Sequence, residues 1–146
     1  MREYLSKNEL NTKAVAAELM TALAGGDIIC LYGELGAGKT TFTKGLAEAL
    51  GIKEEITSPT FTLMNVYQVL SPQSSVLSLI HIDTYRLENE KELLAIGVDD
   101  YLGQTGTVTV VEWPEKIEGL LEGKKVIRIW FEHLEDGGRK IRVENF

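Results

Sequence analysis

The sequence predicts a three-layer α/β fold, in which helices cover both faces of a mixed parallel and antiparallel central sheet. Three observations predict it. A buried-strand pattern at 27–32 leads into a glycine-rich segment and then into a helical stretch. Two strand-like stretches, 61–69 and 76–82, are joined by a link too short for a parallel crossover. Helical and strand-like patterns then alternate towards the C-terminus.

The first helix is predicted to begin at residues 11–12, where an asparagine and a threonine can cap its N-terminus. Val15, Leu19 and Leu23 follow at helical spacing, and the glycines at 25–26 end the helix.

The next stretch, 27–32, is short, apolar and bounded by glycines, which predicts a buried strand. Its single cysteine, Cys30, is expected to pack as a small core hydrophobe. A helix is predicted from about Gly38 to Leu50, and Gly51 ends it.

The stretches 61–69 and 76–82 predict two strands, and the turn-forming residues at 71–75 join them. Because this connection is short, the two strands should form an antiparallel hairpin.

Asn89 and Glu92 make a capping-box pattern for a short helix that ends near Gly97. The β-branched stretch 107–112 then predicts another strand.

Pro114 suits the first turn of a short helix over 115–121. Strands at 126–131 and 140–143, joined by a turn at 136–138, complete the predicted sheet.

Size and charge bound the possible functions. At 146 residues and 16.2 kDa, the chain is predicted to form one domain over 1–146. The apolar runs are far below the ~20 residues that span a bilayer, and the N-terminus is charged, so a cytoplasmic protein with no membrane contact is expected.

The net charge of -7 disfavours generic nucleic-acid binding, so RNA contact would need a local patch or a partner protein. His81 and His133 lie far apart without a matching Cys/His cluster, so no zinc site is expected.

The segment from Gly33 to Thr40 matches the phosphate-binding pattern G-x-x-x-x-G-K-[ST] at every fixed position. Its glycines let several backbone N–H groups turn inward, and the helix that follows adds free N–H groups and the positive end of its dipole. Lys39 reaches the β- and γ-phosphates, and the Thr40 hydroxyl ligates Mg²⁺. The motif therefore predicts ATP and Mg²⁺ as ligands. The predicted nucleotide-binding residues are Gly33, Leu35, Gly36, Ala37, Gly38, Lys39, Thr40 and Thr41.

Two acidic residues come directly after apolar strands: Asp83 follows 77–82, and Glu112 follows 108–111. Ligands of α/β sheets gather outside the carboxyl ends of strands, and Mg²⁺ usually takes at least one carboxylate. One of the two is expected to hold the metal and the other to orient a water or a substrate hydroxyl. Spacing alone leaves the two roles unassigned. Trp113, beside Glu112, is expected to pack in the core, with stacking on a ligand or partner as the alternative.

Four motifs occur in order over nearly the whole chain: GELGAGKTT at 33–41, TSPTFTL at 57–63, HIDTYRL at 81–87 and VEWPEK at 111–116. Together they resemble the bacterial TsaE (formerly YjeE) family. The first motif is shared by a very large number of nucleoside triphosphatases. The other three in combination are far more specific.

The resemblance implies a P-loop NTPase fold and assigns roles to the acidic residues. Thr40 and Glu112 would ligate Mg²⁺, while Asp83 would position the attacking water, and Asp83 and Lys39 would be the catalytic residues. The Ser58-Pro59-Thr60 segment would be a switch-like loop, and the stretch around Asp83 a second one. An adenine contact by Thr12 or by the Gly138-Arg139 turn is a further expectation.

The resemblance also implies partners. Family members work with TsaD and TsaB, which transfer a threonylcarbamoyl group to the adenosine beside the tRNA anticodon. This chain would bind that pair, contact tRNA only through the complex, and reset the complex by hydrolysing ATP. Two alternatives come from other classes: a small P-loop phosphotransferase, disfavoured because no arginine-rich lid insertion is present, and a non-catalytic nucleotide-dependent interaction module.

Overall fold

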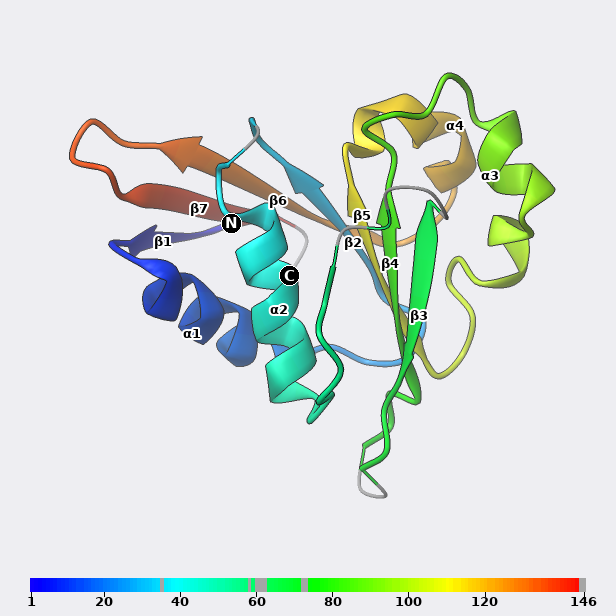
Figure 1. The fold of residues 1–146 in the computed structure, drawn as a ribbon, viewed down its shortest axis with the longest axis horizontal. Coiled ribbons are helices and arrows are strands. Elements are labelled where there is room, and N and C mark those ends of the chain that lie inside the picture. The colour runs from blue at the N-terminus through cyan, green and yellow to red at the C-terminus, as the bar shows by residue number, and fades with distance from the viewer. Residues whose placement is uncertain (35, 58, 60–62, 72–73, 145–146) are drawn as a thin grey trace.

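A computed structural model describes residues 1–34, 36–57, 59, 63–71 and 74–144. Within these residues seven strands form one sheet in the order β1-β7-β6-β2-β5-β4-β3 (Figure 1). The strands are β1 (Arg2–Ser6), β2 (Ile28–Tyr32), β3 (Met64–Gln68), β4 (Ser78–Asp83), β5 (Thr107–Glu112), β6 (Val126–His133) and β7 (Arg139–Glu144). The helices are α1 (Glu9–Met20), α2 (Lys39–Ala49), α3 (Lys91–Ala95) and α4 (Glu118–Leu121), with 3₁₀ turns at Val98–Asp100 and Pro114–Ile117.

The sheet is mixed, as the sequence predicts. Its centre is parallel, because β4 pairs with β5, β5 with β2, and β2 with β6 in the same direction. Both edges are antiparallel: β3 forms the predicted hairpin with β4, and β7 lies between β6 and β1. The parallel centre places the carboxyl ends of β2, β4 and β5 at one edge of the sheet, which is where the site is built.

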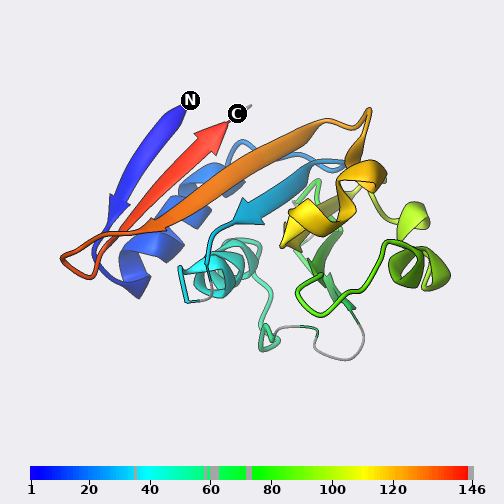
Figure 2. The ribbon, with the colours of Figure 1, turned by 90° about the horizontal axis from the view of Figure 1, so that it is seen from above.

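Helices pack against both faces of the sheet. Alternate residues of β2 point to opposite faces, so Ile29 and Leu31 belong to one buried cluster while Ile28 and Cys30 belong to another. Helices α1 and α2 cover the first face and lie side by side, and α3 and α4 with the 3₁₀ turns cover the second (Figures 1 and 2). Cys30 is a free core residue, as predicted, and burial raises the pKa of its thiol to about 12.

Helix α1 begins earlier than the sequence prediction. Its N-cap is Asn8, whose extended backbone precedes the helix and whose side chain accepts a hydrogen bond from Asn11 N at 2.9 Å. The expected cap at 11–12 is wrong, since Asn11 lies inside the first turn and Thr12 is buried against Ser6 at 2.7 Å. The first turn carries the exposed side chains of Glu9 and Leu10, so the apolar pattern begins only after the helix has started.

Strand β1 is not predicted by the sequence. It is an edge strand in which Ser6 is the one buried residue of five, so it lacks the apolar alternation that predicts a strand. Pairing with β7 holds it, from Arg2 opposite Val143 to Ser6 opposite Arg139. This pairing brings the segment after β1 to the functional site.

Several element boundaries shift. Strand β4 begins at Ser78 rather than at residue 76. Strand β3 begins at Met64 rather than at residue 61, and residues 61 and 62 lie outside the described residues. The capping box expected between Asn89 and Glu92 does not form as predicted. The Asn89 side chain accepts a hydrogen bond from Lys91 N, and the Glu92 carboxylate accepts one from Glu88 N, both at 2.9 Å. The helix predicted over 115–121 divides into a 3₁₀ turn and α4. No helix among the described residues has the length and apolar character needed to cross a membrane.

Candidate functional site

The site lies where three parallel strands end. The glycine-rich loop follows β2, Asp83 is the last residue of β4, and Glu112 is the last residue of β5. Sheet register places Glu112 opposite Asp83 on one side and opposite Leu31 of β2 on the other. The structure therefore brings together the loop and both acidic residues that the sequence singled out.

A cavity of about 440 Å³ opens at this position. Its walls come from the loop and the start of α2, from the segments that follow β4 and β5, and from two distant segments, the residues between β1 and α1 and the β6–β7 hairpin. The lining residues are Lys7, Asn8, Glu9, Thr12, Gly36, Gly38, Lys39, Thr40, Thr41, Asp83, Tyr85, Glu112, Trp113, Gly137 and Arg139.

Most of the predicted nucleotide-binding residues lie on this cavity. Gly33 and Ala37 are not among the lining residues: Gly33 contributes its carbonyl oxygen to Lys39 Nζ, and Ala37 is fully buried, with its N–H donating to Glu34 O at 3.1 Å. Leu35, Ser58 and Thr60 lie outside the described residues. Thr12 and Arg139, named above for an adenine contact, both line the cavity, whereas Lys7, Asn8 and Glu9 were missed because no motif marks them.

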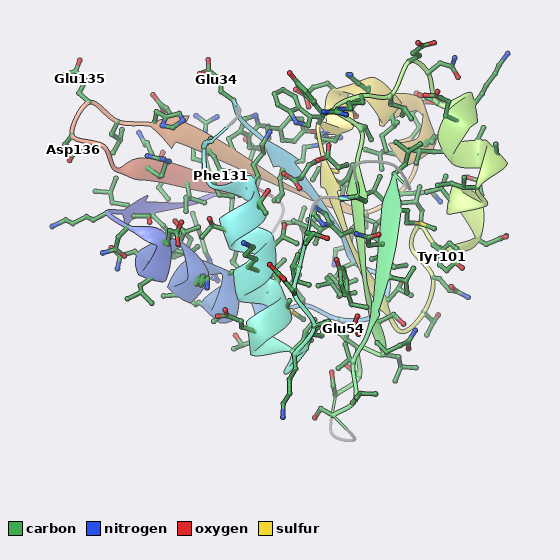
Figure 3. The ribbon with its side chains drawn as sticks, in the orientation of Figure 1. Glu34, Glu54, Tyr101, Phe131, Glu135 and Asp136 are labelled. Carbon is green, nitrogen blue, oxygen red and sulfur yellow. The ribbon has the colours of Figure 1, made fainter. Side chains whose placement is uncertain are left out.

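The loop has the backbone geometry of an anion-binding turn. Gly33, Gly36 and Gly38 have φ of 148°, 77° and 106°, backbone torsions that residues other than glycine rarely adopt. Such torsions allow successive N–H groups of the loop to point towards an anion. Gly38 is the N-cap of α2 and supplies no side-chain cap, which leaves the first N–H groups of α2 for a ligand. Phe131 lies beside the start of α2, edge-on to Phe42 at 5.5 Å, and Glu34 points away from the helix (Figure 3).

Gly33→Ala should destabilise the fold. A Cβ at Gly33 would lie 2.9 Å from Phe131 O, and its φ of 148° is already unfavourable for alanine. We expect the free energy of unfolding to fall by about 3 kcal/mol, measured by urea denaturation without nucleotide. Gly51→Ala is the matched control, because φ is also positive there but nothing lies within 4 Å, so a loss of about 1 kcal/mol is expected. Equal losses at the two positions would contradict the steric argument.

Lys39 is buried with its ammonium group inside the loop. Its Nζ donates to Gly33 O at 2.6 Å and lies 3.5 Å from the centre of the Trp113 ring. Burial lowers the pKa of Lys39, and the nearby carboxylates of Glu112, Glu115 and Asp83 oppose that shift. A buried ammonium held by one carbonyl and one aromatic face is poorly compensated. An anion in the loop would complete its coordination, so these residues fit a phosphate group.

The two acidic residues differ in their surroundings. Glu112 is buried, and its Oε2 lies 2.5 Å from Nε2 of the fully buried His81. Asp83 is partly exposed, and its Oδ1 accepts a hydrogen bond from Tyr85 N at 2.9 Å. Burial raises the pKa of Asp83, the Tyr85 N–H opposes this, and the charge of Glu112 adds to the rise. Glu112 is therefore anchored by His81, whereas Asp83 is the more exposed of the two carboxyl groups that line the cavity.

The segments that follow β4 and β5 are joined to each other. The Thr84 hydroxyl donates to the carbonyl oxygens of both Glu112 and Trp113, and Lys116 Nζ donates to the carbonyls of Tyr85 and Leu87. Trp113 has φ 60° and ψ 50°, a left-handed conformation that turns the chain directly after Glu112.

The expectation that Trp113 packs in the core is wrong. Its ring lies in the cavity wall, over Lys39 and at 5.1 Å from the ring of Tyr85. The turned backbone directs this ring towards the loop. Its position next to Glu112 was the sequence signal for a site role.

The oxygen atoms present suit Mg²⁺ bound with a polyphosphate. Thr40, Asp83 and Glu112 bring a hydroxyl and two carboxylates to one cavity. No group of three or more His, Cys, Asp or Glu side chains within the described part of the chain could hold a metal by itself. Mg²⁺ usually takes one or two carboxylates and completes its shell with water and substrate phosphates, so a small protein donor set fits this ion.

Comparisons with known proteins agree with these motifs. The sequence model of the family described as "Threonylcarbamoyl adenosine biosynthesis protein TsaE" matches residues 6–141. A protein of Bacillus subtilis (strain 168) described as "tRNA threonylcarbamoyladenosine biosynthesis protein TsaE" is 42% identical over 139 residues, which are 95% of this chain and 82% of that protein. A protein of Treponema pallidum (strain Nichols) with the same description is 44% identical over 121 residues, covering 83% of this chain and 84% of that protein.

A solved structure is also similar. It is described as "Crystal structure of Bacillus subtilus YdiB" and superposes with a TM-score of 0.77 at 34% sequence identity. The superposition covers 96% of this chain and 82% of that chain, so the likeness extends over the sheet and both helical layers.

Proposed function

Because this chain belongs to the TsaE family, we propose that it is the ATP-binding and ATP-hydrolysing subunit required for N6-threonylcarbamoyladenosine in tRNA. It acts with TsaD and TsaB, which transfer the threonylcarbamoyl group to the adenosine beside the anticodon, and its fold is a three-layer P-loop NTPase fold. The observation that carries the ATPase role is the single cavity that joins the phosphate loop, Thr40, Asp83 and Glu112.

The proposed pose of ATP follows from the charges around the cavity. The phosphates lie in the loop, where the N-terminus of α2 and Lys39 supply positive charge. The nucleoside extends towards the wall formed by Thr12 and Arg139, whose guanidinium also donates to Gly36 O at 3.0 Å. This hydrogen bond ties the β6–β7 hairpin to the phosphate loop, so both ends of the nucleotide would be held by one connected surface.

Thr40 and Glu112 are proposed as the Mg²⁺ ligands. When bound, Mg²⁺ neutralises charge on the phosphate oxygens. Asp83 is proposed to position the attacking water, because it is the more exposed of the two carboxyl groups and lines the same cavity. Its raised pKa fits a group that accepts a hydrogen bond or a proton from a water molecule.

The net charge of -7 supports an indirect contact with tRNA, since the electrostatic part of RNA binding needs Lys and Arg. TsaD and TsaB would carry the tRNA, and hydrolysis by this chain would reset their complex between turnovers. Slow hydrolysis by the isolated chain and faster hydrolysis with the two partners are expected.

Depletion of the protein in its own organism tests the proposal. The N6-threonylcarbamoyladenosine content of digested tRNA, measured by mass spectrometry, should fall, and re-expression of the wild-type protein should restore it. A tagged protein should retain TsaD and TsaB in a nucleotide-dependent manner. Unchanged nucleoside levels would refute the proposed pathway. Transfer of labelled phosphate to a nucleoside or metabolite would instead favour a phosphotransferase, and tight ATP binding without phosphate release would favour an interaction module.

A further inference from the structure

His81 is a buried imidazole that has no role in the function proposed so far. It lies on β4 two residues before Asp83, so the two side chains project from the same face of the strand. That face also receives Glu112, which the sheet register sets opposite Asp83 on the neighbouring strand. His81 thus lies directly behind the pair of carboxylates at the cavity.

The contact between His81 and Glu112 is short and buried. Nε2 of His81 and Oε2 of Glu112 are 2.5 Å apart, and the two side chains are 0% and 4% exposed. A buried carboxylate is strongly disfavoured unless a donor satisfies it. His81 supplies that hydrogen bond for the Glu112 carboxylate, next to the loop that holds the Lys39 ammonium group.

The same contact restricts the orientation of the carboxylate. A glutamate side chain has three rotatable bonds, and a metal ligand must give up that freedom when the ion binds. A hydrogen bond to one oxygen restricts the side chain beforehand and leaves the other oxygen to bind an ion, since Glu112 also lines the cavity. Metal-ligating groups are commonly held in this way by a partner behind them.

We propose that His81 is a positioning residue for the divalent cation: it donates a hydrogen bond from Nε2–H to Oε2 of Glu112 and thereby presents the other carboxylate oxygen to Mg²⁺ beside Thr40. The inference rests on the proposed function, which supplies Mg²⁺ and ATP. It assigns His81 no contact with the ion, the nucleotide or the reacting atoms. His81 acts only through Glu112.

Two amide substitutions distinguish positioning from packing. In His81→Gln the side-chain amide nitrogen reaches the place of the histidine Nε2 and can still donate to Glu112. In His81→Asn the amide is shorter and reaches only the place of Nδ1, so the donor to Glu112 is lost. Both replacements are neutral and polar, which makes them matched controls for each other. If His81→Asn does not fold, His81→Leu provides the same loss of donor with an apolar side chain suited to this buried position.

The readout is cation affinity rather than hydrolysis. Binding of Mn²⁺ to the protein with a non-hydrolysable ATP analogue is followed by the electron paramagnetic resonance signal of free Mn²⁺. ATP binding in EDTA is measured separately by calorimetry. We expect His81→Asn to weaken Mn²⁺ binding by about tenfold or more, with ATP affinity in EDTA unchanged, and His81→Gln to stay within about threefold of the wild type.

Three results would overturn the inference: wild-type Mn²⁺ affinity in His81→Asn, equal loss in both amide variants, or a loss of the same size in EDTA. Failure of the proposed nucleotide and metal site gives a different result, because the wild-type protein would then not bind the ATP analogue with Mn²⁺ at all. Failure of the proposed pathway is detected separately, as unchanged N6-threonylcarbamoyladenosine levels after depletion of the protein. Retention of wild-type nucleotide and Mn²⁺ binding together with an unaffected His81→Asn variant would remove only the role of His81.

Discussion

Lys39→Ala is expected to lower the affinity for ATP by about 100-fold, so that the purified protein no longer retains ATP in the presence of Mg²⁺. The reason is local. The ammonium group is the one lysine charge inside the loop among the described residues, and it lies 2.6 Å from Gly33 O with its pKa lowered by burial. Loss of a charged hydrogen bond to phosphate removes up to about 3 kcal/mol of binding free energy, which corresponds to this factor. Calorimetric titration with ATP and Mg²⁺ measures it.

The fold should survive the loss of this charge. Because burial lowers the pKa of Lys39, the charged form is disfavoured in the folded protein relative to the unfolded chain, and its removal relieves that penalty. Lys39→Met, which keeps an apolar stem beneath the Trp113 ring, should therefore unfold at a temperature no lower than the wild type without nucleotide.

Lys44→Ala is the control for the effect of Lys39→Ala on ATP affinity. Lys44 lies on the same helix but outside the cavity wall, so its replacement should leave the ATP affinity unchanged. Retention of ATP by Lys39→Ala would refute the phosphate-binding role of the loop.

Asp83→Asn is expected to reduce ATP hydrolysis with TsaD and TsaB by about 100-fold or more while ATP and Mg²⁺ still bind. An amide oxygen can keep the hydrogen bond from Tyr85 N, so the turn after β4 is preserved. It cannot take a proton and is a weaker acceptor for the attacking water. Phosphate release under single-turnover conditions measures the effect on hydrolysis.

Glu112→Gln is the companion of Asp83→Asn, and it decides the roles that sequence spacing left open. It should weaken the Mg²⁺-dependent part of ATP binding, because Glu112 is the anchored carboxylate beside His81. The opposite pattern, with cation affinity lost in Asp83→Asn and retained in Glu112→Gln, would exchange the two roles.

The sequence predicted the central elements of the fold because each depends on residues that are neighbours in the chain. The apolar run of β2, the glycines of the loop and the start of α2 are contiguous, so the strand–loop–helix unit could be read directly. The hairpin of β3 and β4 followed from a short connection. Strand β1 could not be predicted in this way, since its stability comes from hydrogen bonds to β7, at the other end of the chain.

The site likewise combines residues that the sequence predicts with residues that it does not. The motif residues and the two acids are predicted from local patterns. The N-terminal segment containing Asn8 lies at the cavity because β1 pairs with β7, which no local pattern predicts. Trp113 was placed in the core by its residue type, and its left-handed backbone, held by Thr84, turned the ring towards Lys39 instead. Local sequence patterns do not predict the left-handed conformation of Trp113, because Thr84, which follows another strand, stabilises it.

By itself the sequence predicted the strand, glycine-rich loop and helix at 27–50, a mixed sheet and the two strand-end acids, because local spacing encodes torsions, burial and donor groups. Only the tertiary structure decided that Glu112 is buried against His81, 31 residues away, whereas Asp83 is partly exposed, although both line the cavity. Sheet register sets both facts, and register is fixed by the summed hydrogen bonds and packing of several strands rather than by any one segment.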